Sequence, residues 1–317
     1  MAVRDLPPPV AGPGMPKPAE AGVGTEADPR KRRRLWRRRG RSARIPWVSM
    51  SIVLFLLVLP ALFAELITGH DPLRGELVDR LKPPAWVDGG SWTYPLGTDK
   101  QGRDILTRIV YGARISLTVS TVTILIGAFV GCTLGLVAGY FGGWADRIVS
   151  WLIDTFLSLP HVLLALVIVA AIGPSFVTII VVIATTIWSA FARQVRGETL
   201  SVRETEYVAR ARVAGASPWR IVLRHVLPNV ANTLIVLATL QVGVVILEES
   251  SLSFIGAGIP RPNPSWGVMV ADGRDQILTA WWVSLFPGVA ILLVVLALNL
   301  LGDWLRDFLD PKLRQRA

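Results

Sequence analysis

The sequence predicts an all-α integral membrane protein with six transmembrane helices. Of its 317 residues, 52% are hydrophobic and only 18% are charged, and the mean hydropathy is +0.49. This composition is too apolar for an ordinary soluble domain. Apolar windows of about 20 residues, the length that crosses roughly 30 Å of hydrocarbon, lie at 47–69, 115–139, 148–172, 175–192, 229–252 and 281–302.

The distribution of charge predicts the orientation of these helices. Residues 30–44 contain ten of the 33 Lys and Arg residues and no acidic residue, directly before the first apolar window. Such a block is typical of the cytoplasmic side, where it also meets anionic lipid. The arginine-rich segment 193–228 then lies inside as well, and the nearly charge-balanced segments 70–114 and 257–280 lie outside. We expect both termini in the cytoplasm, and we interpret the basic block as a topology anchor rather than a nucleic-acid site.

A regular glycine spacing marks the second apolar window. Glycines every fourth position share one helix face and let another backbone approach closely. We predict a packing stripe that contacts either another helix of this chain or a second subunit. The four residues are Gly127, Gly131, Gly135 and Gly139.

The segment 98–114 combines apolar residues at helical spacing with charged residues on the opposite side, namely Arg103, Asp104 and Arg108. This pattern predicts an amphipathic helix that lies at the outer membrane interface. Its role is either purely structural or to help receive an external binding protein.

Two adjacent acidic residues lie inside the fifth apolar window. A charge in hydrocarbon costs several kcal/mol unless it faces protein or water. Glu248 and Glu249 are therefore candidate substrate-pathway residues. They either face an external vestibule and contact a substrate amine, or they stabilise the turn into 251–270.

The third apolar window, 148–172, contains two further polar or helix-breaking features. Asp154 lies two turns after Arg147, and we expect a structural tie between them or to the adjoining loop. Pro160 should kink the helix, because proline lacks the backbone N–H and clashes with the preceding turn.

Residues for catalysis or metal binding are missing from the sequence. No lysine follows a glycine, so the Gly-Lys-Ser/Thr core of a Walker A phosphate loop is absent. Cys132 is the only cysteine, and the three histidines stand apart, so we predict no catalytic residue, no metal site and no cofactor of its own. The histidines are His70, His161 and His225.

The segment VARARVAGASPWRIVLRHVLPN, residues 208–229, predicts a helix-turn-helix in the cytoplasm. Gly215 suits the left-handed end of one helix, and Ser217 with Pro218 suits the cap and first position of the next. Pro228 closes the second helix at the membrane boundary. A rigid basic turn of this kind fits a cleft with carboxylates on another protein. The expected helices are 199–214 and 218–227.

This turn resembles the cytoplasmic EAA loop of ABC importer permeases. Gly215 matches the glycine of the family pattern, and Leu227 with Pro228 matches its closing Leu-Pro. His225 stands where the family has a hydrophobic residue. The opening Glu-Ala-Ala of the pattern reads Ala209, Arg210 and Ala211.

Three longer stretches are similar to the dipeptide and oligopeptide permeases of the DppC/OppC type. They are YPLGTDKQGRDILTRIVYGARISL at 94–117, GYFGGWADR at 139–147 and SLSFIGAGIPRPNPSWGVMV at 251–270. Because several long motifs occur in one order, the resemblance extends over nearly all of 45–312.

The resemblance implies a type I ABC importer permease with a MetI-like core and an additional N-terminal helix, in the inner membrane of a bacterium. Such a subunit forms half of the translocation pathway for dipeptides or oligopeptides. Its implied partners are a homologous second permease of the DppB/OppB type, two ABC ATPase domains that bind ATP and Mg, an extracytoplasmic substrate-binding protein and membrane lipid. The implied ATPase-coupling residues are Ala211, Arg212, Gly215, Ala216, Ser217 and Pro218.

The expected organisation has four parts: a disordered basic cytoplasmic tail at 1–44, the first transmembrane helix with an outer segment at 45–111, the permease domain at 112–310 with its coupling loop at 193–228, and a cytoplasmic C-terminus at 311–317. The alternative from another class is a secondary transporter or channel that works without ATPase partners. Such a protein would need its coupling charges inside the spans.

Overall fold

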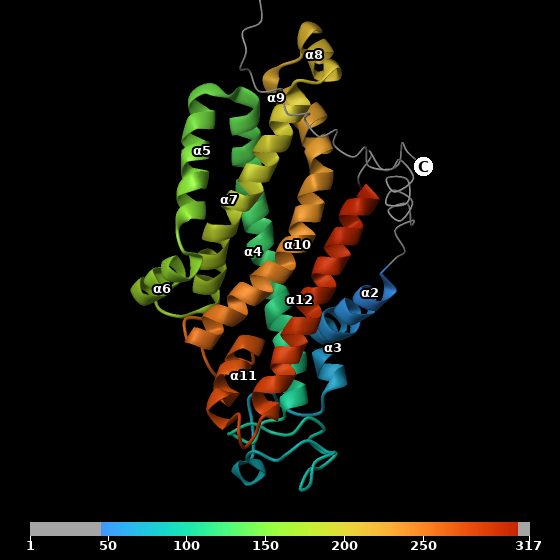
Figure 1. The fold of residues 1–317 in the computed structure, drawn as a ribbon, viewed down its shortest axis with the longest axis vertical. Coiled ribbons are helices and arrows are strands. Elements are labelled where there is room, and N and C mark those ends of the chain that lie inside the picture. The colour runs from blue at the N-terminus through green and yellow to red at the C-terminus, as the bar shows by residue number, and fades with distance from the viewer. Residues whose placement is uncertain (1–45, 310–317) are drawn as a thin grey trace, which may run out of the picture. The chain divides into compact units, whose positions relative to one another are not determined.

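The computed structural model describes residues 46–309 and shows a helical protein (Figure 1). The predicted tail 1–44 and C-terminus 311–317 lie outside the described residues. Within 46–309, five helical stretches are long and apolar enough to cross a membrane, and a bent helix pair makes up to six. The all-α membrane architecture is thus confirmed. The five stretches are Trp47–Ile67, Ile105–Phe141, Phe176–Arg203, Pro218–Ile255 and Trp282–Leu309.

The elements follow one another in chain order from the first span to the last. The first span consists of α2 (Trp47–Val53), the π turn η1 (Leu54–Val58) and α3 (Leu59–Ile67), and it is followed by η2 (Leu77–Asp79), α4 (Ile105–Phe141), α5 (Gly143–Ser158), α6 (His161–Ile172) and α7 (Phe176–Arg203). The second half contains α8 (Glu206–Val213), α9 (Pro218–Ile221), the π turn η3 (Val222–Val226), α10 (Leu227–Ile255), α11 (Trp266–Gly273), η4 (Arg274–Gln276) and α12 (Trp282–Leu309).

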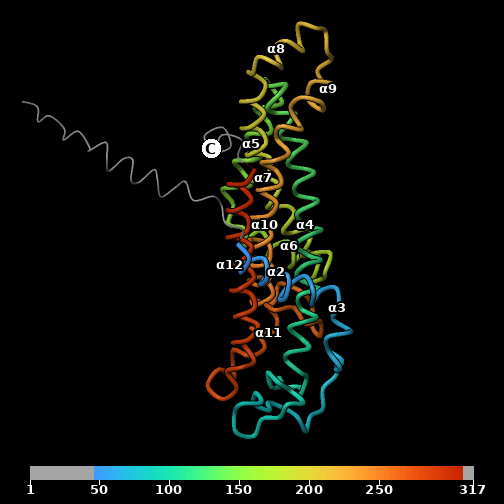
Figure 2. Tube along the Cα trace, turned by 90° about the vertical axis from the view of Figure 1, so that its right-hand side faces the viewer, coloured from blue at the N-terminus to red at the C-terminus, as the bar shows by residue number. Residues whose placement is uncertain are grey.

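Two ends of the helix arrangement carry the loops. Figure 2 shows α8 and α9 at one end and the segment 68–104 at the other. Between them α4, α7, α10 and α12 run side by side, with α2 against α12 and α3 against α4. We call the end with α8 and α9 the knob end and the other the opposite end.

The third predicted span is broken rather than kinked. α5 ends at Ser158, α6 begins at His161, and their axes differ by 89°. Pro160 is the N-cap of α6, with an extended backbone, because a proline cannot donate the hydrogen bond that would continue α5. α6 therefore lies across the bundle (Figure 1).

Two of the prolines inside the membrane helices each follow a π turn, whereas Pro287 lies within α12. Pro60 comes directly after Leu59, the first residue beyond η1, and Pro228 occupies the same place after η3. A π turn widens the helix locally and shifts its hydrogen bonds, so the missing proline N–H is tolerated. The prediction that Pro228 closes a helix is therefore wrong, since the helix continues from α9 through η3 into α10.

The α4–α7 pair is the most extensive helix contact within the described chain. All four glycines of the stripe face α7. A Cβ added to Gly135 would lie 2.7 Å from the Ala192 carbonyl oxygen and 2.9 Å from the Val195 Cβ, and one added to Gly139 would lie 2.7 Å from the Thr199 Cβ. The stripe is thus covered by a helix of this chain and lets the two backbones approach closely.

The predicted amphipathic helix at 98–114 is not a separate element. Residues from 105 onward belong to α4, which Asp104 caps by accepting hydrogen bonds from the Leu106 and Thr107 N–H groups. Arg103 and Arg108 are buried instead of facing solvent. The amphipathic pattern gave a wrong prediction because these arginines are neutralised by acidic partners inside the protein. The helical spacing of the sequence does not reveal those partners.

An ion network at the opposite end explains this burial. Arg103 Nε and Nη2 both lie 2.7 Å from Asp99 Oδ2, and Arg108 Nε lies 3.7 Å from the same oxygen. Asp272, on α11, accepts from Arg261 Nε at 2.9 Å and Nη2 at 2.8 Å. Buried charges require such partners, so the network joins the loop before α4 to α11.

Two buried indoles complete this junction. Trp266 Nε1 donates to the Ile109 carbonyl at 2.9 Å, and Trp282 Nε1 donates to the Thr98 carbonyl at 3.2 Å. A Cβ on Gly112 would meet the Trp266 ring at 2.6 Å, so α4 needs a glycine there. These bonds hold three elements together as one unit, namely the loop that precedes α4, the helix α11 and the helix α12.

The loop between η2 and α4 contains a smaller polar cluster outside the spans. Tyr94 Oη donates to Asp79 Oδ2 at 2.7 Å, and Lys82 Nζ donates to Asp79 Oδ1. The hydrogen bond to Asp79 raises the pKa of Tyr94 to about 12. The hydrogen bonds from Lys82 and Tyr94 hold the pKa of Asp79 below its ordinary value.

The stripe generates a stability prediction. Gly135→Ala places a methyl group against the α7 backbone, and such overpacking costs about 1–3 kcal/mol. Gly197→Ala is the matched control, because a Cβ there meets nothing within 4 Å and the helix gains up to about 1 kcal/mol in propensity. Thermal unfolding in detergent should show a lowered midpoint for Gly135→Ala and no loss for Gly197→Ala. Equal midpoints would contradict the packing assignment.

The polar cluster generates a titration prediction. Asp79→Asn removes the largest cause of the raised Tyr94 pKa, so the phenol should titrate closer to 10. The native contribution of Tyr94 to stability is present below pH 10 and is lost as the pH rises toward 12, whereas that of Asp79 is present above 3.8 and is lost as the pH falls below it. Ultraviolet titration of phenolate, corrected with Tyr94→Phe, measures the shift.

Asp88→Asn removes an exposed carboxylate on the same loop and should leave the Tyr94 titration unchanged. An Asp79→Asn protein whose Tyr94 still titrates near 12 would show that Asp79 is not the cause.

Candidate functional site

The knob, residues 206–221, is a pair of short helices joined by a tight turn. The Ala216 N–H donates to the Ala211 carbonyl and the Gly215 N–H to the Arg212 carbonyl, both at 3.1 Å. Together with the φ of +79° at Gly215, these bonds form a Schellman motif. Ser217 Oγ then accepts from the Arg220 N–H at 3.4 Å and caps α9. Gly215 and Ser217 thus take the conformations that the sequence predicts.

The predicted helix boundaries need correction. α7 continues to Arg203, so the expected helix 199–214 is divided by a turn before α8 begins at Glu206. α9 is continuous with α10 through η3, as described above, so the expected helix 218–227 has no separate end. The knob is therefore connected directly to two long helices.

An apolar core fixes the knob to these helices. Val208 of α8 and Ile221 of α9 are fully buried, and they pack with residues from the knob ends of α4, α7 and α10. The residues that complete this cluster are Leu136, Val195, Val202, Val222, Val226 and Val230. Motion of the knob is therefore coupled mechanically to these helices.

Two arginines brace the same end. Arg196 of α7 binds Asp146 of α5 through both oxygens, with Nη2 at 2.9 Å from Oδ2. Arg203 Nη1 donates to the Gly139 carbonyl at 2.8 Å, at the end of the glycine stripe. The bidentate Arg–carboxylate pair fixes the relative position of α5 and α7 more firmly than a single hydrogen bond would.

The outer surface of the knob is basic and partly apolar. Of the six predicted coupling residues, Ala211 and Ala216 are half-buried and the other four are exposed: Arg212, Gly215, Ser217 and Pro218. Sequence reasoning missed two large apolar side chains beside them, Val213 at 90% and Trp219 at 59% exposed. The signal that could have indicated them is a large apolar residue directly beside an arginine on each side of the turn.

The charges of the knob are unevenly paired. Arg210 Nη2 lies 2.9 Å from Glu206 Oε2, whereas Arg212 and Arg220 have no ion-pair partner among residues 46–309. Exposed apolar side chains next to unpaired arginines form the pattern of a protein-binding surface.

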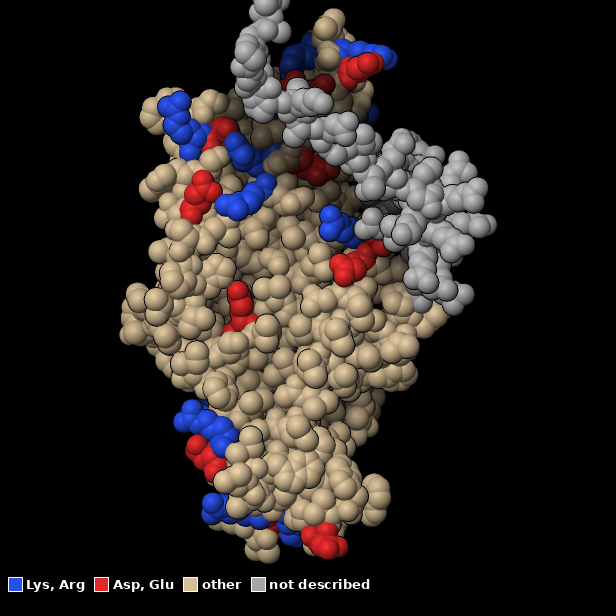
Figure 3. All heavy atoms as spheres, in the orientation of Figure 1, with Lys and Arg blue, Asp and Glu red and all other residues tan. Residues whose placement is uncertain are grey.

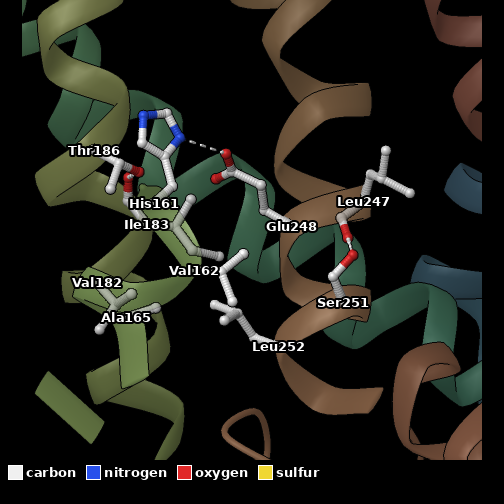
Figure 4. A pocket seen from close by; sticks show the side chains of 10 residues that line it. All are labelled: His161, Val162, Ala165, Val182, Ile183, Thr186, Leu247, Glu248, Ser251 and Leu252. Carbon is white, nitrogen blue, oxygen red and sulfur yellow. Dashed lines mark hydrogen bonds and ion pairs between the residues drawn. The ribbon is translucent and has the colours of Figure 1, made fainter. Parts of the chain in front are cut away.

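A cavity of about 160 Å³ lies between α6, α7 and α10 at the level of the apolar belt. His161 and Glu248 extend into it from opposite sides (Figure 4), and His161 Nδ1 lies 3.4 Å from Glu248 Oε1. Most of the wall is aliphatic, contributed by Val162, Ala165, Val182, Ile183, Leu247 and Leu252, and Thr186 and Ser251 complete it.

The two predicted pathway glutamates separate in the structure. Glu248 borders the cavity, whereas Glu249 is fully buried. Glu249 Oε1 accepts from Ser253 Oγ at 2.7 Å, and Ser253 Oγ accepts from the Ile259 N–H at 3.2 Å. Because it is fully buried, Glu249 does not face a vestibule. Its hydrogen bond with Ser253 instead stabilises the turn after α10.

A second, larger hollow of about 670 Å³ lies nearer the knob end, between α7, α10 and α12. It is more polar than the first. Its polar lining consists of Gln194, Glu198, Asn229, Asn232, Thr233 and Arg306. Polar side chains at membrane depth face protein or water rather than lipid, so this side of α7 and α10 is predicted to be covered or hydrated.

Charged side chains are concentrated at the two ends of the visible face, with a broad, almost uncharged belt between them (Figure 3).

On α5, Asp154 pairs with Arg193 of α7 at 2.9 Å and not with Arg147, whose guanidinium lies 6.0 Å from the Trp144 ring centroid. The expected Asp154–Arg147 tie is therefore wrong, because α7 supplies the nearer cation.

A helical membrane domain with hollows between its long helices and a rigid knob that carries a protein-binding surface is the architecture of a membrane transport subunit that works with a partner. The matching family is the "Binding-protein-dependent transport system inner membrane component", over residues 131–315. The chain belongs to this family, and it is thus a membrane component of a transport system that has further subunits.

Curated relatives agree with this assignment. The chain is 39% identical to the glutathione transport system permease protein GsiD of Pectobacterium atrosepticum, covering 87% of this chain and 94% of that protein. It is 42% identical to the di/tripeptide transport system permease protein DppC of Pseudomonas aeruginosa, covering 84% and 88%. With DppC of Alkalihalophilus pseudofirmus the identity is 43%, covering 83% and 84%. The resemblance to the DppC type is confirmed.

A solved structure has the same fold. A chain of the inward-facing MetNI methionine ABC transporter matches with a TM-score of 0.54 and 20% identity, covering 64% of this chain and 96% of that chain. The MetI-like fold prediction is therefore confirmed.

Proposed function

We propose that this chain is the permease subunit of an ATP-driven peptide importer, in which it forms half of the translocation pathway. The observation that carries this proposal is the knob. Its surface carries Val213, Trp219 and two unpaired arginines on a locked turn, and its core is continuous with three long helices. Such a surface suits a partner cleft with an apolar floor and carboxylates at its rim.

The partner of the knob is an ABC ATPase domain in this account. The sequence lacks a Gly-Lys pair, so ATP and Mg bind on two separate ATPase domains and this chain contributes no catalytic residue and no cofactor. The remaining partners are a homologous second permease of the DppB/OppB type, an extracytoplasmic substrate-binding protein and membrane lipid around the uncharged belt. Nucleic acid is not a partner.

The knob end is cytoplasmic in this proposal, as are both termini. The support is the charge of the sequence, with the basic block at 30–44 and the arginines of 193–228 on the same side. The buried ion network of Asp99, Arg103 and Asp272 then lies on the outer side, where it holds the loops that would meet the substrate-binding protein.

Peptides are the proposed substrates because the relatives are permeases for di- and tripeptides, dipeptides and glutathione, and glutathione is itself a tripeptide. The polar hollow near the knob end would form part of the pathway wall. Its amide and hydroxyl side chains bind peptide groups without regard to sequence, which suits a broad substrate range.

Transport follows from a change in contacts at the knob. When the ATPase domains close, they displace the knob, and the shared core of α8, α9, α4, α7 and α10 transmits the displacement to the membrane helices. The helices thereby alternate between inward-open and outward-open arrangements, each stabilised by different contacts. The Arg196–Asp146 bridge moves α5 with α7.

The docking proposal is tested by a pair of variants that differ only in charge. Asn and Asp both tolerate the left-handed backbone at Gly215, and a Cβ there meets nothing within 4 Å. Gly215→Asp adds an acidic group to a basic docking surface, so it should reduce recovery of the ATPase subunits in a detergent pull-down at least about tenfold, as loss of a charge-assisted contact does. Gly215→Asn should retain them.

Equal recovery of the ATPase subunits with both variants would show that the knob charge does not contact the ATPase. Wild-type chain that is purified without any ATPase and moves solute in liposomes without ATP would favour the secondary transporter or channel instead.

A further inference from the structure

We propose that the cavity between α6, α7 and α10 binds the N-terminal ammonium group of the transported peptide, with Glu248 as its counter-charge. This inference rests on the proposed function and adds a substrate-contact site within the membrane domain. It is carried by four features of the cavity: an under-paired carboxylate, a weakly held histidine, two hydroxyl acceptors in an otherwise aliphatic wall and a small volume.

The Glu248 carboxylate is only partly satisfied. Its Oε1 faces His161, and its Oε2 has no hydrogen-bond partner among residues 46–309. A carboxylate at membrane depth is costly without a cation or several donors. Its neighbour in sequence, Glu249, also has one oxygen without a hydrogen-bond partner, but its side chain is fully buried and does not line the cavity. Glu248 is therefore the acidic group available to a ligand.

His161 is a replaceable partner for this carboxylate. It is the first residue of α6, directly after the break between α5 and α6, and it reaches across to α10. The 3.4 Å separation is longer than the 2.7–2.9 Å typical of a charge-assisted hydrogen bond, and the imidazole is about 40% exposed. A ligand cation can displace or share this contact at little cost.

Apart from His161, the polar groups of the lining accept hydrogen bonds rather than donating them. Thr186 Oγ1 donates its proton to the Ile183 carbonyl at 2.8 Å, and Ser251 Oγ donates to the Leu247 carbonyl at 2.7 Å. Their oxygen lone pairs remain for a donor, and no Lys or Arg lines the cavity. An ammonium group has three donors and no acceptor, so this lining suits an ammonium and disfavours a carboxylate.

The volume limits what can enter. Pockets for whole small ligands usually measure about 300–1,000 Å³, and this one measures about 160 Å³. It has room for one end of a peptide. Its aliphatic wall then packs on the first side chain while the rest of the peptide extends along the face of α10.

The experiment measures binding to the complete purified transporter without its substrate-binding protein, so that the ligand preference of that protein does not contribute. The probes are radiolabelled alanyl-phenylalanine and its N-acetylated form, which lacks the ammonium. Wild type should bind the free-amino probe at least about tenfold more tightly, the ratio expected for one hydrogen bond to a charged group. Glu248→Gln should abolish this preference.

A matched variant serves as the control. Glu65→Gln removes an exposed carboxylate that lies 3.4 Å from Arg114 at the edge of the first span and should keep the preference.

The assignment is overturned if wild type shows no preference for the free-amino probe, or if Glu248→Gln retains it. Displacement of both probes equally by phospholipid would also overturn it, because the cavity would then be a lipid site. Co-purified ATPase subunits distinguish these results from failure of the proposed function: if they remain, only the cavity assignment fails.

Discussion

The close approach of α4 and α7 is the constraint on which the rest of the structure depends. In a membrane, where lipid is as apolar as leucine, helices associate through close packing of small residues rather than through hydrophobic burial. The glycine stripe provides this contact over about three turns of α4. At one end of the pair lies the ion network around Asp99, and at the other lies the knob core, so α4 connects the two loop-bearing ends in one helix.

The helix α10 connects the knob mechanically to both the larger hollow and the smaller cavity. This helix is continuous with α9 of the knob through η3, and it carries Asn229 and Asn232 of the larger hollow as well as Glu248 of the smaller cavity. A displacement at the knob therefore moves two walls of the proposed pathway together. α6 is a separate element that begins after the break at Pro160. The contact between His161 of α6 and Glu248 of α10 therefore joins two elements that are free to separate.

Local features of the sequence predicted much of the fold and the shape of the knob. Apolar windows and a four-residue glycine period depend on helix geometry alone, and the turn conformation at Gly215 follows from its own backbone preference. Features that depend on distant partners could not be predicted. The pattern around Arg108 indicated a solvent-exposed side chain, because its partner Asp99 lies before the helix start. The partner of Glu248 is His161, which lies 87 residues away in the sequence.

The most direct measurement is cross-linking from two highly exposed positions, one at the knob end and one at the opposite end. Val213 on the knob is 90% exposed and Leu278 at the opposite end is 96% exposed, and replacing Cys132, the only cysteine, leaves a background for single cysteines. In the complete transporter in membranes, a cysteine at 213 should cross-link to the ATPase subunit and one at 278 should not. Cross-links from 278 to the ATPase subunit, or none from 213 while that subunit is present, would contradict the account.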